Sequence, residues 1–296
     1  MTETVIRALS ESDAHLFHTL PDPLGIGRAL SHVTHRPAWQ RVALRDGRVV
    51  ARAAWWGGEN DSSPVNVNWF DVAEGEEEAG AELLRTAPYQ VDYELLLPPG
   101  WRDDAGLRAA GEARIRAARA AGMRILVERF RYRWTPENGL PERRARLVYR
   151  PEPDDEVILD ILRRVHSTTL DAHALRAIEQ GGIDQAAREE LEFFHWCPSP
   201  REWWRVAETP EGELVGLHIP AHVPAGPCVD FIGVVPEARG HGYAYDLLTE
   251  CLHFLVEHGA ESVLGATDQS NVPMAKHFAR AGFPVIQERI DFVHGA

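Results

Sequence analysis

Hydrophobic positions in the second half of the chain follow first a strand-like and then a helical spacing. The apolar run from Val229 to Val235 is typical of a buried strand. Pro236 ends it, because proline has no N–H to donate to a sheet ladder. The next apolar positions recur with the spacing of one helix face: Leu247, Leu248, Cys251, Leu252, Leu255 and Val256. The pattern predicts a strand, a short loop and a helix over residues 229–256.

Two segments that lie 160 residues apart carry the same pattern. Residues 121–134 read AGMRILVERFRYRW and residues 281–294 read AGFPVIQERIDFVH, with Ala-Gly and Glu-Arg at matching offsets. Upstream, residues 41–43 and 205–207 each lead through an Asp-Gly or Glu-Gly turn into a second apolar run, which predicts a β-hairpin in each half. Strand-like openings at residues 5–7 and 147–149 also correspond. Matches in the same order favour an internal duplication over chance similarity.

Each half is therefore predicted to run strand, helix, hairpin, strand, helix, strand, helix, strand. This is a mixed α/β plan around a central sheet. We predict one domain at 1–135 and another at 145–296, because the two prolines and the Asn-Gly pair of residues 135–141 cannot sustain a helix or a central strand. The second half has about 20 extra residues before its hairpin, including a helical run at 185–191. This insertion fits a substrate lid and core packing equally well.

Charge and cysteine content exclude several classes of protein. The net charge of -14 disfavours a nucleic-acid partner, since phosphate binding is dominated by Lys and Arg. No apolar run reaches the ~18–20 residues of a membrane helix, and the first residues lack the features of a secretory signal. The three cysteines show no C-x-x-C spacing, which argues against a disulfide framework or a zinc site. We expect a cytoplasmic protein with no metal and with neither a membrane nor a nucleic-acid partner.

A glycine-rich loop, RGHGYA at residues 239–244, joins the predicted strand to the predicted helix. Backbone N–H groups at a helix start lack intrahelical partners, and the helix dipole adds partial positive charge. Gly240 and Gly242 carry no Cβ, so an anion can approach the backbone closely. Arg239 can add to this field or pair with the sheet. Taken alone, the loop predicts either a phosphate site or a structural turn.

The loop and a second segment together resemble the GNAT N-acyltransferase superfamily. Residues 239–244 are similar to its coenzyme A motif R-x-x-G-x-G/A, and residues 232–236 to the strand that precedes it. Downstream, residues 271–283 resemble N-x-x-A-x-x-L-Y-x-x-x-G-F. The resemblance implies two tandem GNAT-like domains, each with a mostly antiparallel sheet flanked by helices. It also implies N-acetyltransferase activity with acetyl-CoA as the acyl donor.

The resemblance assigns roles to particular residues. The amides around Gly240, Gly242 and Ala244 would bind the pyrophosphate. Val234 and Val235 would pair with the pantetheine arm like an added strand, where the two central strands splay apart, and Asn271 would hydrogen-bond that arm. The full predicted coenzyme set is Val234, Val235, Arg239, Gly240, His241, Gly242, Tyr243, Ala244, Asn271 and Phe278.

The first half departs from the coenzyme pattern. Its corresponding loop, residues 71–80, has no R-x-x-G-x-G and carries Glu74, Glu76, Glu77 and Glu78. Like charges would repel a diphosphate there. We therefore predict a degenerate, structural first domain beside an active second one.

Acyl transfer to an amine needs a base, since an alkyl ammonium has a pKa near ~10.4. Asp230 is the first candidate, because a carboxylate inside an apolar strand requires a reason. Cys228, His218 and His222 remain alternatives. The tyrosine that the family often uses as general acid is replaced by Phe278.

The predicted function is transfer of an acetyl group to the amine of a small molecule, by a monomer or homodimer. One alternative is a non-catalytic acyl-CoA-binding or regulatory module, which the phenylalanine at 278 favours. Another is a protein N-acetyltransferase, which a lid over the cleft disfavours.

Overall fold

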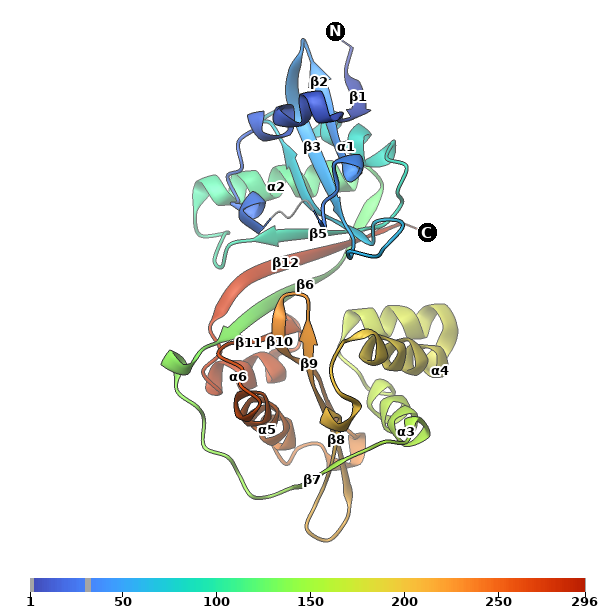
Figure 1. The fold of residues 1–296 in the computed structure, drawn as a ribbon, viewed down its shortest axis with the longest axis vertical. Coiled ribbons are helices and arrows are strands. Elements are labelled where there is room, and N and C mark those ends of the chain that lie inside the picture. The colour runs from blue at the N-terminus through green and yellow to red at the C-terminus, as the bar shows by residue number, and fades with distance from the viewer. Residues whose placement is uncertain (1–2, 30–32, 296) are drawn as a thin grey trace. The chain divides into compact units, whose positions relative to one another are not determined.

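The computed structural model describes residues 3–29 and 33–295. Internal contacts divide the chain into two compact units, one formed by residues 1–128 with 287–296 and the other by residues 129–286. The strands of the first unit follow the order β1-β2-β3-β4-β5-β12, and those of the second β6-β11-β10-β9-β8-β7. Figure 1 shows the helices and strands of both units. The mixed α/β class that the sequence predicts is confirmed.

The first unit is built from the N-terminal elements and is completed by a strand from the end of the chain. Its elements are β1 (Val5–Ala8), η1 (Glu11–Thr19), η2 (Ile26–Ala29), η3 (Pro37–Trp39), β2 (Gln40–Arg45), β3 (Arg48–Trp56), β4 (Asn66–Val72), α1 (Glu77–Arg85), β5 (Asp92–Leu97), α2 (Ala105–Ala120) and most of β12 (Val285–His294). The helix expected after the first strand is the 3₁₀ helix η1. The predicted hairpin turns at Asp46 and Gly47, both of which have positive φ, as a two-residue hairpin turn requires.

The second unit holds the remaining elements, with helices on both faces of its sheet. They are the later part of β6 (Met123–Trp134), η4 (Pro136–Asn138), β7 (Val148–Pro151), α3 (Asp155–His166), α4 (Ala172–Trp196), η5 (Arg201–Trp203), β8 (Arg205–Glu208), β9 (Leu214–Val223), β10 (Gly226–Val234), η6 (Pro236–Ala238), α5 (Tyr243–Glu257), β11 (Val263–Asp268) and α6 (Val272–Arg280). In Figure 1, α3 and α4 lie on one face of this sheet and α5 and α6 on the other.

Each unit contains a strand from the opposite half of the chain. Residues 129–134 of β6 pair antiparallel with β11, and residues 288–292 of β12 pair antiparallel with β5. These strands are the two repeated segments at 121–134 and 281–294. The sequence predicts domains at 1–135 and 145–296, whereas the contacts divide the chain after residues 128 and 286. The cause is that the last strand of each half completes the sheet of the other half.

The sheets are mostly antiparallel, as predicted. The parallel pairs are β4 with β5 and β10 with β11. In the second unit one core cluster joins α3 and α4 to β9, and another joins α5 and α6 to β6 and β11. The two central strands, β10 and β11, therefore have a helix layer on each side.

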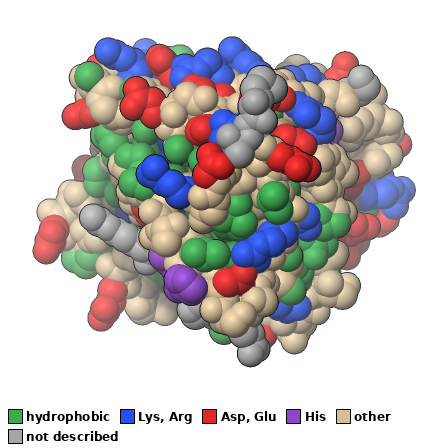
Figure 2. All heavy atoms as spheres, turned by 90° about the horizontal axis from the view of Figure 1, so that it is seen from above, with side chains coloured by type: hydrophobic (Ala, Val, Ile, Leu, Met, Phe, Trp, Pro, Cys, Tyr) green, Lys and Arg blue, Asp and Glu red, His purple; other side chains and the backbone are tan. Residues whose placement is uncertain are grey.

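Charges of both signs lie side by side on one face of the molecule. Figure 2 shows a face on which acidic, basic and hydrophobic side chains are intermingled. The net charge of -14 is not gathered into a single acidic field on that face.

Candidate functional site

The loop at residues 239–244 combines an exposed backbone with the start of a long helix. Gly240 and Gly242 have φ values of +84° and +77°, a region that side chains with a Cβ rarely adopt. Gly242 is the N-cap residue of α5. A Cβ at Gly240 would meet only open space, so solvent or a ligand can reach this backbone directly.

The N–H groups of this loop are available for an anion. Among the described residues, no acceptor is recorded for the N–H groups of Gly240, His241 and Gly242. These donors lie at the N-terminus of α5, whose dipole favours negative charge there. These open donors make the loop a candidate site for an anion such as a diphosphate.

Arg239 faces the protein and not the open side of the loop. Its guanidinium donates to the carbonyl oxygens of Val234 at 3.2 Å, Thr168 at 3.0 Å and Val165 at 3.4 Å. Of the two roles left open by the sequence, the structure shows pairing with the backbone. Arg239 thus ties the loop to the end of α3.

His241 and Tyr243 lie along the loop. Their rings stack with centroids 5.5 Å apart, and Ala244 follows in the first turn of α5. His241 is exposed and Tyr243 is half-buried. The predicted coenzyme residues of the loop are therefore contiguous and accessible, apart from the inward-turned Arg239 side chain.

β10 and β11 separate shortly after they begin to pair. Their parallel register holds only Cys228 opposite Leu264. The residues of β10 beyond this point pair with β9 alone, so the edge of β10 that faces β11 is open up to Val234. Val235 donates its N–H to Val215 at 3.0 Å. The splay that the family resemblance implies is present, and it leads directly into the loop.

Asn271 and Phe278 lie beside this splay on the segment after β11. Asn271 caps α6, accepting from the N–H of Met274 at 3.3 Å. Phe278 is 1% exposed and stacks on Tyr132, with ring centroids 4.4 Å apart. Phe278 therefore offers a ring and no hydroxyl, and the chain has no general acid at that position.

Asp230 lies in a β-bulge of β10. The pairing with β9 passes from Val229 to Phe231 and leaves Asp230 as the extra residue. Val229 packs with the α5 cluster, whereas Phe231 packs with the α3 and α4 cluster. The Oδ2 of Asp230 is inaccessible and has no hydrogen-bond partner. Burial raises the pKa of Asp230 to about 7.

Glu190 on α4 is a site residue that the sequence analysis missed. Burial raises its pKa to about 8, and the negative charges of Asp230 and Asp171 add to this rise. Arg129 lowers it, and also pairs with Asp268 at 3.2 Å and with Asp171 at 3.5 Å. Asp230 and Glu190 thus lie within electrostatic reach of each other on the α4 side of the sheet. The sequence signal that could have indicated Glu190 is its position as a carboxylate in the inserted helical run at 185–191.

The other candidate bases are placed less favourably. Burial raises the pKa of the Cys228 thiol, with Asp230 adding to the rise, so this thiol is a poor base. His218 is fully buried, pairs with Ile232 in the sheet and contacts Tyr149. Burial lowers its pKa to about 3, and the structure does not bring it together with Asp230. His222 lies against Trp203 with ring centroids 5.4 Å apart.

The insertion forms the long helix α4, which is interrupted by Gly182 at φ +84°. Phe194 is buried and packs on Phe231, while Phe193 and Trp196 are exposed and stack on each other. One face of the insertion is thus core packing. The same helix carries Glu190 toward the bulge, as a wall of the candidate site would.

Comparison with known proteins relates this geometry to a known family. The Acetyltransferase (GNAT) family matches residues 171–283, which include the loop, the bulge and α6. A mycothiol acetyltransferase from Saccharomonospora viridis is 26% identical over 170 residues, 54% of this chain and 52% of that protein. The part of the second unit that carries the loop, the bulge and α6 is thus similar to GNAT acetyltransferases.

Solved GNAT structures show the same fold across both units. A GCN5-related N-acetyltransferase from Sphaerobacter thermophilus matches 98% of this chain and 94% of its own, with 16% identity and a TM-score of 0.53. A glucosamine N-acetyltransferase region of a fungal multi-domain β-N-acetylglucosaminidase matches 99% of this chain and 38% of its own, with 14% identity and a TM-score of 0.53. The chain spans about half the length of the curated relative that it matches.

The first unit differs from the second at the end of β4 and the loop of residues 71–80, which corresponds to the loop at 239–244. Arg114 on α2 donates to the carbonyl oxygen of Phe70 on β4 at 3.0 Å and forms a close ion pair with Asp71. Arg52 also pairs with Asp71, at 2.5 Å, and all three charged groups are buried. Buried guanidinium groups therefore fill the space beside the end of β4. The carboxylates after Gly75 are engaged too: Glu76 pairs with Arg45 at 2.5 Å and Glu77 with Arg116 at 2.7 Å.

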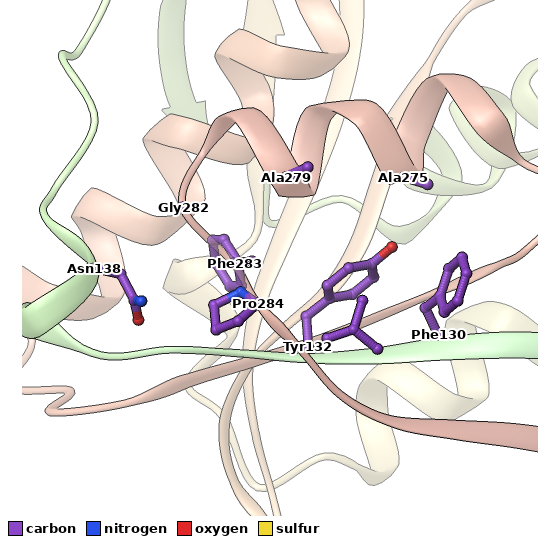
Figure 3. A pocket seen from close by; sticks show the side chains of 9 residues that line it. Phe130, Tyr132, Asn138, Ala275, Ala279, Gly282, Phe283 and Pro284 are labelled. Carbon is purple, nitrogen blue, oxygen red and sulfur yellow. The ribbon is translucent and has the colours of Figure 1, made fainter. Parts of the chain in front are cut away.

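A hollow of about 530 Å³ lies elsewhere in the second unit, between β6 and α6. Figure 3 shows Phe130 and Tyr132 on β6 directed toward Ala275 and Ala279 on α6. None of the predicted coenzyme or catalytic residues lines this hollow. Its mostly apolar wall offers no base, so the chemistry is better supported at the bulge.

Two other classes of site are absent from residues 3–29 and 33–295. No group of three or more His, Cys, Asp or Glu side chains there could hold a metal ion. No helix there is both long and apolar enough to cross a membrane.

Proposed function

We propose that the second unit transfers an acetyl group from acetyl-CoA to the amine of a small molecule. One observation carries the proposal. The open N–H groups at 240–242 follow β10, the strand that separates from β11. The same strand carries the carboxylate of Asp230 in a bulge, where its Oδ2 has no hydrogen-bond partner. A diphosphate on those N–H groups would direct the pantetheine arm into the splay. The acyl group would then approach the side where Asp230 and Glu190 lie.

Asp230 acts as the base. A pKa raised to about 7 keeps a useful fraction of its carboxylate ionised near neutral pH and lets it accept a proton from an ammonium group. The neutral amine forms the new C–N bond, and the C–S bond of the thioester breaks. Asp230 keeps the proton taken from the ammonium, and the second proton that the nitrogen loses after attack passes through water to the departing thiolate, since Phe278 has no hydroxyl.

Glu190 makes the acceptor side acidic. With its pKa raised to about 8, Glu190 is largely protonated at neutral pH, and a cationic acceptor would favour its ionised form, so the two carboxyl groups favour an acceptor that arrives as a cation. The acceptor is enclosed by α4, which suits a small molecule better than a protein tail. The similar proteins are named as acetyltransferases, which supports the reaction type. The proposal of a cationic acceptor follows from these carboxyl groups alone.

The reaction is tested by thiol release from acetyl-CoA with a panel of small amines. The expected result is turnover with at least one cationic amine and none with acetyl-CoA alone. Tight coenzyme binding without turnover across the panel would instead support the non-catalytic binding module, which the missing hydroxyl at Phe278 favours. Loss of both binding and turnover would reject both functions.

Replacing Asp230 with Asn is expected to lower kcat about 100-fold, the usual range for loss of a general base. In the wild type, kcat/KM should rise with pH through about 7, where Asp230 becomes ionised. The variant should lose that rise while binding acetyl-CoA as before. A pH profile unchanged by D230N would show that another group is the base.

The same two carboxyl groups predict an unusual dependence of stability on pH. Their pKa values are higher in the folded state, about 7 for Asp230 and about 8 for Glu190, so folding takes up protons between the unfolded pKa near ~4 and these values. Their contribution to the free energy of unfolding therefore falls as pH rises from 5 to 8. From pH 5 to 8, denaturant unfolding should show a loss of unfolding free energy about 6 kcal/mol larger in the wild type than in a D230N/E190Q double variant. Parallel curves for the two proteins would contradict the raised pKa values.

A further inference from the structure

Three arginines from separate segments converge beside the start of α5. Arg146 lies in the linker before β7, and its Nη2 would be 3.8 Å from a Cβ added at Gly242. Arg144, in the same linker, lies 5.3 Å from the ring of Tyr245. Arg280, at the end of α6, lies 4.0 Å from the same ring. We call Arg144, Arg146 and Arg280 the arginine cluster.

This cluster is distinct from Arg239, which is turned toward the carbonyl oxygens of Val165, Thr168 and Val234. Arg146 is anchored against the loop because it donates to the carbonyl oxygen of His241 at 3.2 Å and lies 5.0 Å from the ring of Tyr243. Arginine stacked on an aromatic face keeps its edge free to donate, which is the geometry for recognising phosphate.

The charges of the cluster are only partly neutralised. Asp246 pairs closely with Arg146 and also lies 3.6 Å from Arg144, and its side chain is fully buried. In the described part of the chain, no carboxylate lies within ion-pair distance of Arg280. Asp246 pairs with two of the three arginines, which leaves an excess of about two positive charges in a chain whose net charge is -14.

Neighbouring groups do not remove this excess. Arg143, the next linker arginine, is already paired with Glu250 and Glu257, both at 2.9 Å. His277 lies 5.8 Å from Tyr245 by ring centroids, and burial and the charge of Arg280 lower its pKa, so it stays neutral at pH 7. An excess of two positive charges matches a phosphate monoester, which carries about -1.5 to -2 at neutral pH.

We propose that the arginine cluster binds the 3′-phosphate of the donor nucleotide and makes the unit selective for coenzyme A over nucleotides that lack this phosphate. The inference rests on the proposed function, because it assumes that the diphosphate occupies the N–H groups of 240–242. Coenzyme A carries its second anionic group one ribose away from the diphosphate. The cluster continues from Gly242 along the first turn of α5, where that group would lie.

The proposal is tested with the full chain by titration calorimetry, using coenzyme A and 3′-dephospho-coenzyme A as the two probes. The wild type is expected to bind coenzyme A about 10–100-fold more tightly, the range for one or two charge-assisted hydrogen bonds. Arg280→Gln should reduce that ratio about tenfold while leaving the affinity for the dephospho form unchanged. Arg280 is exposed, so folding should tolerate the change, and a melting curve checks this.

Arg143→Gln is the matched control, since its charge is already paired by two carboxylates, and it should leave the ratio unchanged. Equal affinities of the wild type for the two probes would overturn the inference and leave the proposed function standing. An Arg280→Gln variant that weakens both probes equally would show that the cluster serves the diphosphate, and would also overturn it. Binding of neither probe would reject the proposed function and the inference together.

Discussion

Replacing Gly242 with Glu is expected to weaken acetyl-CoA binding about 1,000-fold. The residue has φ +77°, so any side chain adds backbone strain, and a carboxylate at the N-cap of α5 would repel the diphosphate. Together these effects amount to about 4 kcal/mol, which is close to three factors of ten. Titration calorimetry with acetyl-CoA measures the change.

The first unit supplies the matched control. Gly75 has φ +76°, lies in open space and also precedes a helix, so Gly75→Glu imposes a similar backbone cost. Because the first unit is proposed to bind no coenzyme, this variant should bind acetyl-CoA like the wild type. Gly242→Ala separates strain from charge and should have an intermediate effect. A Gly242→Glu variant that still binds with wild-type affinity would exclude the loop as the coenzyme site.

Replacing Asp71 with Ala is expected to destabilise the first unit by about 3–5 kcal/mol. Asp71 is fully buried and accepts from Arg52 at 2.5 Å, from Trp69 at 2.7 Å and from Arg114. Removing the carboxylate leaves two buried guanidinium groups without a counter-charge, which costs far more than the loss of a surface pair. Denaturant unfolding followed by tryptophan fluorescence reports the change, since Trp69 is itself a partner.

Glu77→Ala is the control for this variant. Glu77 pairs with Arg116 near the surface, and the arginine side chain is 57% exposed, so the loss should be within about 1 kcal/mol. If both variants lost the same small amount of unfolding free energy, the buried ion pairs of Asp71 would not be what stabilises the end of β4 in the first unit.

The order of the elements could be predicted from sequence because each depends on local signals. The apolar run before Pro236, the helical spacing after Gly242 and the Asp46-Gly47 turn each fix an element within a few residues. The loop at 239–244 was also predictable, because glycine at positive φ before a helix leaves N–H groups open whatever surrounds it.

The strand exchange could not be predicted in this way. Residues 121–134 and 281–294 have nearly the same pattern, so either strand satisfies either sheet edge. Which edge is taken depends on the path of the connecting chain, and the pattern carries no record of that path.

The approach of Glu190 to Asp230 could not be predicted from the sequence, although Asp230 itself was a candidate base. The bulge at Asp230 shifts the facing of the strand by one residue, and the break at Gly182 sets the direction of the helix that carries Glu190. Neither feature changes the hydrophobic spacing. In the same way, nothing in the spacing of α2 indicates that Arg114 fills the space beside the end of β4 in the first unit.

A crystal structure of the full chain with acetyl-CoA tests the central claim most directly. The account predicts the diphosphate within hydrogen-bond distance of the N–H groups of residues 240–242, with the thioester on the Asp230 side of the splay and no nucleotide in the first unit. A nucleotide bound beside residues 74–80, or a loop at 239–244 that stays empty at saturating acetyl-CoA, would contradict it.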